Sequence, residues 1–397
     1  MTDIPTIRLK PKHDRRAKAG HPWIFSNELD GDVKELPAGG AVDVFDPQGK
    51  FLGRGYANPA SLITIRLMSQ RRREDIDHPA FYAERLREAV ALREAVYPGR
   101  TAWRAVHGEA DRLPGLVIDR FGDHLAVQIS TLGMEARMDA LRQAIEEVFQ
   151  PKSVVLRNDA KVRELEGLSL GRSLWWGDLP DEVRFEDAGV TYALNMLGGQ
   201  KTGHFFDQSR NRAFAGALCA GRTMLDVYAN TGGWALQALK HGATAATVID
   251  SDEGNGLAAL NNARINGFGE RLTAIQGEAK RTLQAMVSDG ARFGAVSLDP
   301  PAFAKQRKAA GSALRGYREI NALGMMLVEE GGFFFTSSCS YHVFEDRFVD
   351  ALQQAAADAG RRLRLIRRGE QAPDHPVLLA VPETRYLKSL AFQVHSG

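Results

Sequence analysis

The sequence predicts a multidomain protein whose last part is an α/β domain with a doubly wound, Rossmann-like parallel sheet. The chain has 397 residues, which at about 150 residues per domain is enough for two or three domains. After Asp207, short apolar runs alternate with segments of helical length, and strands separated by such helices form a parallel sheet. Shorter β-branched runs with Pro and Gly turns come before it. We therefore expect three domains, at residues 1–73, 74–190 and 191–397.

The first of these, residues 1–73, is predicted to be a small β-barrel. Apolar or alternating runs at Ala41–Phe45, Phe51–Tyr56 and Leu62–Leu67 are separated by Pro and Gly turns, as barrel strands are. The charged, turn-rich stretch Gln70–Pro79 then has the composition of a linker.

Residues 74–190 are predicted to be an independent α+β domain. Apolar residues recur at helical spacing in two segments, and β-branched runs lie between and after them. The expected helices are Phe81–Val96 and Met134–Val148, and the expected strands are Ala102–His107, Leu116–Ile118, His124–Ser130 and Ser153–Arg157.

In residues 191–397 strand and helix alternate regularly. The expected strands are Thr223–Tyr228, Ala245–Ile249, Leu272–Ile275, Ala295–Leu298 and Gly332–Thr336, with Leu363–Ile366 and Tyr386–Phe392 at the edge of the sheet. The expected helices lie near Trp234–Lys240, Gly254–Asn266, Ala279–Val287, Leu314–Val328 and Glu345–Ala357.

Composition and charge exclude several classes of protein. Hydrophobic residues make up 44% and charged residues 25% of the chain, which excludes a disordered or fibrous protein. The net charge is only +2, yet residues 1–73 contain 13 basic and 8 acidic residues, a net of +5, which leaves −3 for the rest. The excess of basic residues is therefore confined to the first domain.

The two cysteines, Cys219 and Cys339, are far apart in sequence, so we expect neither a disulfide framework nor a Cys-x-x-Cys metal site. The N-terminus mixes charges with prolines, unlike a signal peptide, and no apolar run approaches the roughly 18 residues of a membrane span. We expect a cytoplasmic protein without a metal or a membrane partner. A homodimer is a further expectation.

The first strand of the last domain ends in a glycine-containing loop from Tyr228 to Gly233, with a helix directly after it. Glycine lets the backbone turn sharply and approach a ligand, and a helix N-terminus faces that ligand. The loop lacks the Gly-x-Gly-x-x-Gly pattern, which disfavours a dinucleotide. Asp250 ends the second strand, where a carboxylate accepts hydrogen bonds from ribose hydroxyls. The structural alternative is a turn followed by a helix-capping aspartate.

The fourth and fifth strands end in polar motifs. The fourth ends in Asp299-Pro300-Pro301, and the prolines prevent the strand or a helix from continuing, so the Asp299 carboxylate stays in the crevice. The fifth ends in a run of hydroxyl residues that contains Cys339. Because neighbouring parallel strands end at the same edge, we expect Asp299 and Cys339 to face the same space. We expect Cys219, in a run of small residues, to be a buried inert thiol.

A basic segment near the N-terminus is a candidate for contact with RNA. Basic residues are concentrated between Arg8 and Lys18, and the aromatic run His21–Phe25 follows. Basic residues interleaved with aromatic ones suit phosphate contact and base stacking, whereas the structural alternative is a solvated charged face with Trp23 in the core. The candidates in this segment are Lys10, Lys12, Arg15, Arg16 and Lys18.

These motifs, together with Gly199-Gln200-Lys201-Thr202-Gly203-His204-Phe205-Phe206-Asp207-Gln208, resemble one family in their order along the chain. It is the class I S-adenosylmethionine-dependent methyltransferases that form 5-methylcytosine in bacterial large-subunit (23S) ribosomal RNA. The resemblance covers essentially the whole chain and implies an N-terminal PUA barrel, to which His21–Phe25 and Gly53–Tyr56 are similar. It thereby adds Arg54 to the candidates for contact with RNA. It implies that S-adenosylmethionine is held by Phe205, Asp207, Gln208, Arg210, Asp226, Tyr228, Asn230, Thr231, Gly232, Asp250, Ser251, Asp299 and Pro300, with Glu278 near the adenine.

The resemblance also implies a mechanism. Carbon 5 of cytosine is a poor nucleophile, and addition of the Cys339 thiolate to carbon 6 would activate it. Asp299 would hydrogen-bond or protonate the ring. Many cytosine-5 RNA methyltransferases have a second Cys after the Pro of the fourth-strand motif, where this chain has Ala302. The base that removes the carbon-5 proton stays unassigned.

Two other functions remain as alternatives. Methylation of a base nitrogen needs no thiol and uses an Asn or Asp followed by Pro-Pro and an aromatic residue. In this chain Ala302 stands where that motif has its aromatic residue, and Phe303 comes one position too late. A non-catalytic, RNA-binding ribosome assembly factor would not need both Asp299 and Cys339. The pattern Gly167-Leu168-Ser169-Leu170-Gly171 fits a nucleophile elbow, but no helix pattern follows it, so an esterase is disfavoured.

Overall fold

The computed structural model describes residues 4–198, 202–304, 306 and 309–397. Gly199, Gln200 and Lys201 of the sequence motif lie outside these residues. The chain divides into two compact units. Unit 1 comprises Met1–Val183, Asn195–His204 and Pro373–Thr384, and unit 2 comprises Arg184–Leu194, Phe205–Ala372 and Arg385–Gly397. In the part of the chain that is described, no helix is both long and apolar enough to cross a membrane.

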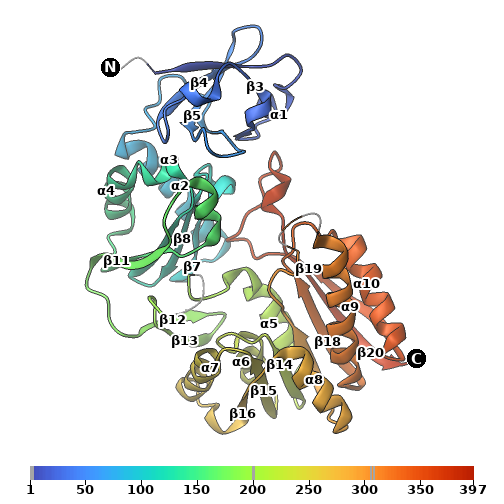
Figure 1. Ribbon diagram of the computed structural model, residues 1–397. Coiled ribbons are helices and arrows are strands. Elements are labelled where there is room, and N and C mark those ends of the chain that lie inside the picture. The colour runs from blue at the N-terminus through green and yellow to red at the C-terminus, as the bar shows by residue number, and fades with distance from the viewer. Residues whose placement is uncertain (1–3, 199–201, 305, 307–308) are drawn as a thin grey trace. The chain divides into compact units, whose positions relative to one another are not determined.

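Unit 1 begins with a six-stranded, barrel-like sheet in the order β2-β6-β5-β4-β1-β3 (Figure 1). Neighbouring strands are antiparallel except β1 and β4, which run parallel. β-Branched and leucine side chains such as Val42, Val44 and Ile65 form its core. The elements are β1 (Thr6–Leu9), α1 (Arg15–Lys18), β2 (Trp23–Ile24), β3 (Leu29–Asp30), β4 (Ala41–Phe45), β5 (Phe51–Ala57) and β6 (Ile65–Ser69).

A second sheet of unit 1 has five strands in the order β11-β10-β9-β8-β7 and packs against two helices through a separate apolar core. The predicted helix Met134–Val148 is interrupted at Arg137, a buried residue whose guanidinium donates to the carbonyl oxygens of Gly39 and Gly133. The elements are α2 (Pro79–Val96), β7 (Ala102–His107), β8 (Leu116–Phe121), β9 (His124–Ile129), α3 (Leu132–Glu135), α4 (Met138–Phe149), β10 (Ser153–Asn158) and β11 (Gly171–Gly177).

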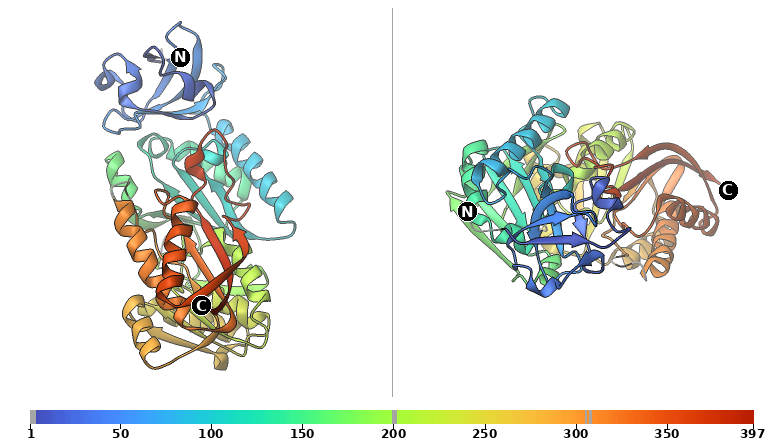
Figure 2. Two further views of the ribbon diagram at one scale, coloured as in Figure 1. Left: turned by 90° about the vertical axis from the view of Figure 1, so that its right-hand side faces the viewer. Right: turned by 90° about the horizontal axis from the view of Figure 1, so that it is seen from above.

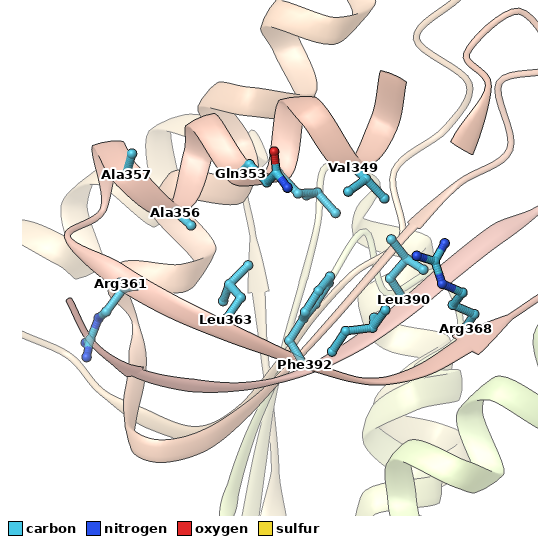
Figure 3. A pocket seen from close by; sticks show the side chains of 11 residues that line it. Val349, Gln353, Ala356, Ala357, Arg361, Leu363, Arg368, Leu390 and Phe392 are labelled. Carbon is cyan, nitrogen blue, oxygen red and sulfur yellow. The ribbon is translucent and has the colours of Figure 1, made fainter. Parts of the chain in front are cut away.

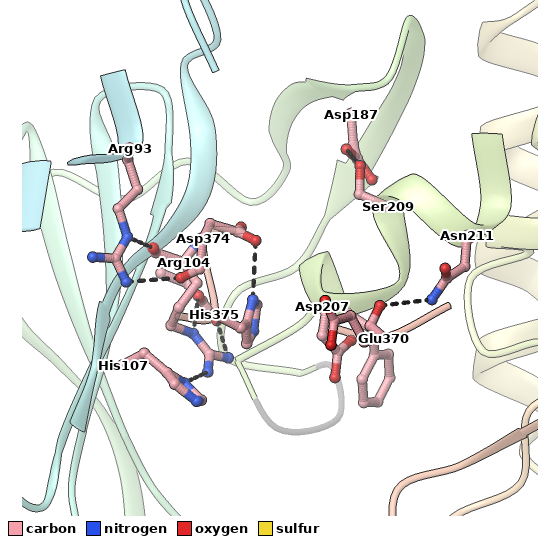
Figure 4. Close-up of polar contacts among 12 residues, drawn as sticks. Arg93, Arg104, His107, Asp187, Asp207, Ser209, Asn211, Glu370, Asp374 and His375 are labelled. Atoms are coloured by element: carbon pink, nitrogen blue, oxygen red, sulfur yellow. Dashed lines mark hydrogen bonds and ion pairs between the residues drawn. The ribbon is translucent and has the colours of Figure 1, made fainter. Parts of the chain in front are cut away.

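The segment Pro373–Thr384 belongs to unit 1, although its sequence neighbours belong to unit 2. The fully buried Arg93 binds the Asp111 carboxylate at 2.6 and 2.8 Å and donates to the Asp374 carbonyl oxygen at 2.7 Å. The backbone N–H of Arg104 donates to the Asp374 carboxylate at 3.0 Å (Figure 4). A buried ion pair recovers its desolvation cost only with good geometry, so these contacts fix the position of the segment more than they add stability.

Unit 2 contains a seven-stranded sheet in the order β16-β15-β14-β17-β18-β20-β19. The first five strands run parallel, and β20 is antiparallel to both β18 and β19. The strands are β14 (Thr223–Val227), β15 (Ala245–Asp250), β16 (Leu272–Gln276), β17 (Phe293–Leu298), β18 (Val328–Ser338), β19 (Arg361–Gly369) and β20 (Lys388–Ser396).

Helices cover both faces of this sheet, as a parallel sheet requires (Figures 1 and 2). Side chains of α8, α9 and α10 share one apolar core with the central strands, among them Leu283, Tyr317 and Phe348. The helices are α5 (Ser209–Ala217), α6 (Gly233–Lys240), α7 (Glu253–Ile265), α8 (Ala279–Ser288), α9 (Ala310–Met326) and α10 (Glu345–Asp358). The predicted fold class is confirmed: a small N-terminal barrel, a central α+β part and a doubly wound α/β domain.

One small sheet of unit 2 was not predicted. Strands β12 (Val183–Asp187) and β13 (Val190–Leu194) pair across a two-residue turn at Ala188 and Gly189, which have φ angles of 49° and 74°. Asn262 of α7 accepts from the Ala193 N–H at 2.8 Å and attaches this hairpin to the domain.

Candidate active site

The order of strands reverses direction at β14, since β15 and β16 lie on one side of it and β17 and β18 on the other. In doubly wound sheets, ligands bind outside the carboxyl ends of the strands at this point. The loops after β14, β15, β17 and β18 carry most of the residues that the sequence predicts for cofactor binding and catalysis. They therefore converge on one edge of unit 2.

The loop after β14 has an unusual backbone. Tyr228 and Asn230 have φ angles of 63° and 48°, and Gly232 has 83°, all in the left-handed region. Two non-glycine residues in this region store conformational strain, which is common where a loop is shaped for a ligand. A Cβ on Gly232 would lie 3.0 Å from the Cβ of Ala259, so a side chain there would push α7 away.

Asp226 lies beneath this loop and is fully buried. Its carboxylate accepts from the backbone N–H of Ala235 at 3.1 Å and from the Ser297 hydroxyl at 2.9 Å. Burial raises the pKa of Asp226 to about 7, although both hydrogen bonds act in the opposite direction. Asp226 thus joins β14 to the first turn of α6 and to β17, and supports the loop from inside.

Asp250 ends β15 beside the same loop. Its half-buried carboxylate accepts from the backbone N–H of Asn230 at 2.9 Å, from that of Asp252 at 3.0 Å and from the Asn255 amide at 3.1 Å. Carboxylate oxygens offer about four acceptor sites in all, so capacity for a further donor remains. Ser251 follows and is exposed.

Asp299, directly after β17, lies among polar groups of three segments. The Gln208 amide donates to one carboxylate oxygen at 3.1 Å, and the Trp234 indole N–H donates to the other at 3.3 Å. The Asn211 amide in turn donates to Gln208 at 2.7 Å, which orients the Gln208 amide group toward Asp299. Burial, followed by the negative charge of Asp207, raises the pKa of Asp299 to about 6.

Residues Phe205–Arg210 span a 3₁₀ turn, η5 (Phe206–Gln208), and the start of α5. Asp207 accepts from the Tyr386 hydroxyl at 2.6 Å, and its carbonyl oxygen accepts from the Ala372 N–H at 2.9 Å. Asn211 also donates to the Glu370 carbonyl oxygen at 3.1 Å (Figure 4). Phe205 is half-buried and Arg210 is exposed.

Glu278 is the N-cap of α8. Its exposed carboxylate accepts from the backbone N–H groups of Lys280 at 3.1 Å and Arg281 at 2.8 Å. Both contacts belong to the helix cap, so the sequence motif at this position has a structural role whether or not it also contacts a ligand.

Cys339 follows β18 between two fully buried serines. The hydroxyls of Ser338 and Ser340 each lie 3.0 Å from the Tyr317 hydroxyl of α9. Because side chains alternate along an extended chain, this anchor places the Cys339 side chain on the other side, where it is half-buried. The Cys339 sulfur lies 4.0 Å from the Pro300 carbonyl oxygen, so the two predicted motifs meet.

Cys219 behaves differently. Its thiol is completely buried at the C-terminal end of α5 and lies 3.2 Å from the Ala215 carbonyl oxygen. Burial raises the pKa of Cys219 to about 12, which keeps the thiol protonated and unreactive. The prediction of a buried structural thiol is confirmed.

The predicted RNA-contacting residues lie in unit 1 and differ in their surroundings. Lys10, Lys12 and Arg15 are exposed, whereas Arg16 is half-buried against His21 at 2.8 Å. Lys18 pairs with Asp14 and Asp46, and Arg54 binds the Asp43 carboxylate at 2.7 and 3.1 Å and the Glu74 carbonyl oxygen at 2.9 Å. Trp23 is half-buried and donates to Glu109 at 2.9 Å.

A cavity of about 460 Å³ lies between α10 and the strands β19 and β20 (Figure 3). Its lining is mostly apolar, with Val349, Leu363, Leu390 and Phe392, and Arg361 and Arg368 stand at its ends. None of the residues predicted for the cofactor or for catalysis lines this cavity.

Comparisons with known proteins identify the class of this site. A family model of PUA-like domains matches residues 7–70, and a model of S-adenosylmethionine-dependent methyltransferases matches residues 171–393, more than half of the chain. Unit 2 thus contains an S-adenosylmethionine-dependent methyltransferase domain.

Ribosomal RNA large subunit methyltransferase I of Tolumonas auensis is 36% identical over 97% of this chain and 98% of its own. The protein of the same name from Klebsiella pneumoniae is 33% identical over 99% of this chain and all of its own. The chain belongs to this family of S-adenosylmethionine-dependent methyltransferases. A protein of solved structure from Streptococcus mutans has the same fold, with a TM-score of 0.83, 16% identity and coverage of 98% of this chain and 100% of its own.

The cofactor is therefore S-adenosylmethionine, and the residues at the carboxyl edge fit it. A half-buried carboxylate with spare acceptor capacity ends β15, as a ribose requires. The loop after β14 keeps its backbone close to α7 only because Gly232 has no side chain. When bound, S-adenosylmethionine supplies an electrophilic methyl group. By their position, Asp250, the loop after β14 and the segment Phe205–Arg210 would hold it.

Several residues of this site were missed by the sequence analysis. Trp234 and Asn211 position Asp299 and Gln208, Tyr317 anchors the Cys339 segment, and Lys388 lies beside that segment. Trp234 directly follows the glycine pair of a predicted loop, so its position was a signal that could have found it. Tyr317 and Lys388 lie within ordinary helix and strand patterns and give no such signal.

Proposed function

We propose that this protein methylates carbon 5 of a cytosine in large-subunit ribosomal RNA, with Cys339 as the nucleophile. The names of the relatives support the substrate class. The observation that carries the choice of base is the half-buried Cys339 thiol, which is held at the end of β18 next to Pro300. Methylation of a base nitrogen has no use for a thiol at that position.

In the proposed reaction, Cys339 loses its proton and the thiolate adds to carbon 6 of the ring. The electron pair of the C5–C6 double bond then makes carbon 5 nucleophilic enough to accept a methyl group. After methylation, carbon 5 carries both a methyl group and a proton. Loss of that proton restores the double bond, and the bond between carbon 6 and the Cys339 sulfur breaks to release the thiolate.

Asp299 supports the addition step. With a pKa raised to about 6 by burial and by the charge of Asp207, its carboxyl group holds a proton closer to neutral pH than an ordinary aspartate does. A protonated Asp299 can donate to the cytosine ring as negative charge develops there. The amides and indole of Gln208, Asn211 and Trp234 fix its orientation.

We further propose that residues 1–73 form the RNA-binding domain, 74–190 the central domain and 191–397 the methyltransferase domain. Lys10, Lys12 and Arg15 support RNA contact because they are exposed in a basic part of the sequence. Lys18 and Arg54 have carboxylate partners, so RNA would have to compete with Asp14, Asp46 and Asp43 for them. Self-association into a homodimer stays a prediction, and light scattering tests it by measuring the molar mass of the protein in solution.

The proposal is tested with ribosomal RNA that contains 5-fluorocytosine. Fluorine at carbon 5 cannot leave as a proton, so attack by Cys339 is expected to leave a stable protein–RNA adduct that peptide mass spectrometry maps to this residue. Cys339→Ala is expected to abolish both the adduct and turnover while S-adenosylmethionine binding persists. Cys219→Ala, the matched control, is expected to keep both.

Normal cytosine methylation by Cys339→Ala, or an adduct on another residue, would overturn the mechanism. A methylated base nitrogen in the RNA product, without any adduct, would replace it with the alternative reaction. Mass mapping of ribosomal RNA nucleosides from cells with and without the gene identifies the methylated base directly.

A further inference from the structure

A lysine lies next to the segment that carries Cys339. Lys388 begins β20, which is antiparallel to β18, and is paired in register with Ser338. Its ammonium group donates to the Ser340 carbonyl oxygen at 2.7 Å and to the Tyr386 carbonyl oxygen at 2.9 Å. The positive charge is therefore held at the residue that follows Cys339.

The buried surroundings of Lys388 disfavour its positive charge unless a negative charge lies nearby. Burial lowers the pKa of Lys388 to about 8, and the charge of a Cys339 thiolate would act in the opposite direction. Glu345 of α10 acts in the same sense as Cys339, and Arg385 opposes it. A thiolate at Cys339 would therefore lie within electrostatic range of the Lys388 ammonium group.

Other titratable side chains belong to the segments around Cys339, among them Asp299, which directly precedes Pro300. Tyr317 of α9 contacts the hydroxyls of Ser338 and Ser340, on the opposite side of the segment from the thiol, and burial raises the pKa of Tyr317, which keeps its hydroxyl neutral. The ring of His342 in the loop after Cys339 lies 5.3 Å from that of Tyr341. Among the residues that the structure describes, Lys388 is a cation hydrogen-bonded directly to the backbone of the Cys339 segment.

We propose that the Lys388 ammonium group is a positioning residue that stabilises Cys339 as a thiolate before the RNA is bound. This rests on the proposed function of Cys339 as the nucleophile. The thiol proton passes to solvent water, Lys388 remains protonated, and the thiolate is left beside a fixed positive charge. An opposite charge within roughly 4–6 Å lowers the pKa of an acid by about 1–3 units.

Two substitutions separate this electrostatic role from a purely structural one. Lys388→Gln can still donate to the two carbonyl oxygens but has no charge, whereas Lys388→Arg keeps both the charge and the donors. If Lys388 only holds the loop, both variants should behave like the parent. If its charge stabilises the thiolate, only Lys388→Gln should differ.

The pKa of the Cys339 thiol is measured from the pH dependence of its alkylation by iodoacetamide. In a Cys219→Ala background Cys339 is the only cysteine, because the chain has two. Lys388→Gln is expected to raise the midpoint by about one to two pH units and to slow alkylation at neutral pH about tenfold or more. Lys388→Arg is expected to restore most of the rate.

Lys240→Met is the matched control, since Lys240 also donates to a backbone carbonyl oxygen, that of Ala188, and the substitution removes the same charge. It is expected to leave the midpoint unchanged. Equal midpoints in Lys388→Gln and the parent would overturn the inference, as would equal upward shifts in Lys388→Gln and Lys388→Arg. Thermal unfolding and S-adenosylmethionine binding show that each variant is folded.

The 5-fluorocytosine adduct distinguishes this inference from the proposed function. An adduct that forms at Cys339 with an unchanged thiol midpoint in Lys388→Gln refutes the role of Lys388 and leaves the function intact. A shifted midpoint without any adduct in the parent refutes the nucleophilic role of Cys339 instead.

Discussion

Replacement of Asp226 by Asn should remove a pH dependence from the stability of the methyltransferase domain. Burial raises the pKa of Asp226 to about 7, whereas an aspartate in the unfolded chain has its ordinary value of 3.8. Between these two values the folded state keeps a proton that the unfolded state has released. Stability from this group therefore falls as the pH rises through this range, by about 2–3 kcal/mol between about pH 5 and about pH 8.

Asn reproduces the shape of the protonated carboxyl group. Its oxygen can accept from the Ala235 N–H, and its amide can donate to the Ser297 hydroxyl, which then becomes the acceptor. Asp226→Asn should therefore fold, and its stability should lack the decrease of about 2–3 kcal/mol between about pH 5 and about pH 8.

The assay is urea unfolding without cofactor at both pH values. A separate unfolding experiment with S-adenosylmethionine identifies the transition of the methyltransferase domain, because the cofactor stabilises only the domain that binds it. Asp358→Asn is the control. Asp358 is exposed, and its hydrogen bond from Arg318 lowers its pKa, so it is ionised throughout this pH range in both states. Parallel losses of stability in Asp226→Asn and the parent would refute the reasoning.

Two further predictions concern ligands. Asp250→Ala should weaken S-adenosylmethionine binding about 10- to 100-fold in calorimetry, because hydrogen bonds to a charged acceptor are lost, while RNA affinity stays unchanged. Equal cofactor affinity in the variant and the parent would disprove the ribose assignment. Reversal of Arg15 and Arg16 to Glu should weaken RNA binding and flatten its dependence on salt by about 0.7 per lost phosphate contact. The same reversal at the exposed residues Arg264 and Arg292 controls for net charge, and an unchanged salt slope in the Arg15 and Arg16 variant would mean that this segment is only a solvated face.

Much of the architecture could be predicted because strand and helix repeat with different periods. Each expected strand of the last domain appears within a few residues of its prediction, and β17 and β18 are parallel neighbours, as expected. The hairpin of β12 and β13 was missed, although Val183, Phe185, Val190 and Tyr192 alternate around a turn. Their signal was short, and a two-residue turn without Asn-Gly or Asp-Gly is easily overlooked.

The broken helix at Arg137 shows a second limit. Apolar residues continue at helical spacing across the break between α3 and α4, so the local sequence predicts a single helix, Met134–Val148. The break coincides with a buried guanidinium that donates to carbonyl oxygens of Gly39 and Ile76, both remote in sequence. Such long-range hydrogen bonds leave no trace in the periodicity of the segment itself.

The same limit governs the candidate site. The sequence placed Asp299 and Cys339 at the ends of neighbouring strands, because strand order alone decides which ends meet. It did not reveal that Tyr317 and Lys388 hold the Cys339 segment, since these residues come from elements whose side chains point to this edge only after folding. Nor could it distinguish Arg54, which binds Asp43, from the exposed Lys10. Positions along a strand follow from periodicity, whereas the partners of a charged side chain follow from packing, so the chemistry of the site depends most on the contacts that sequence patterns do not contain.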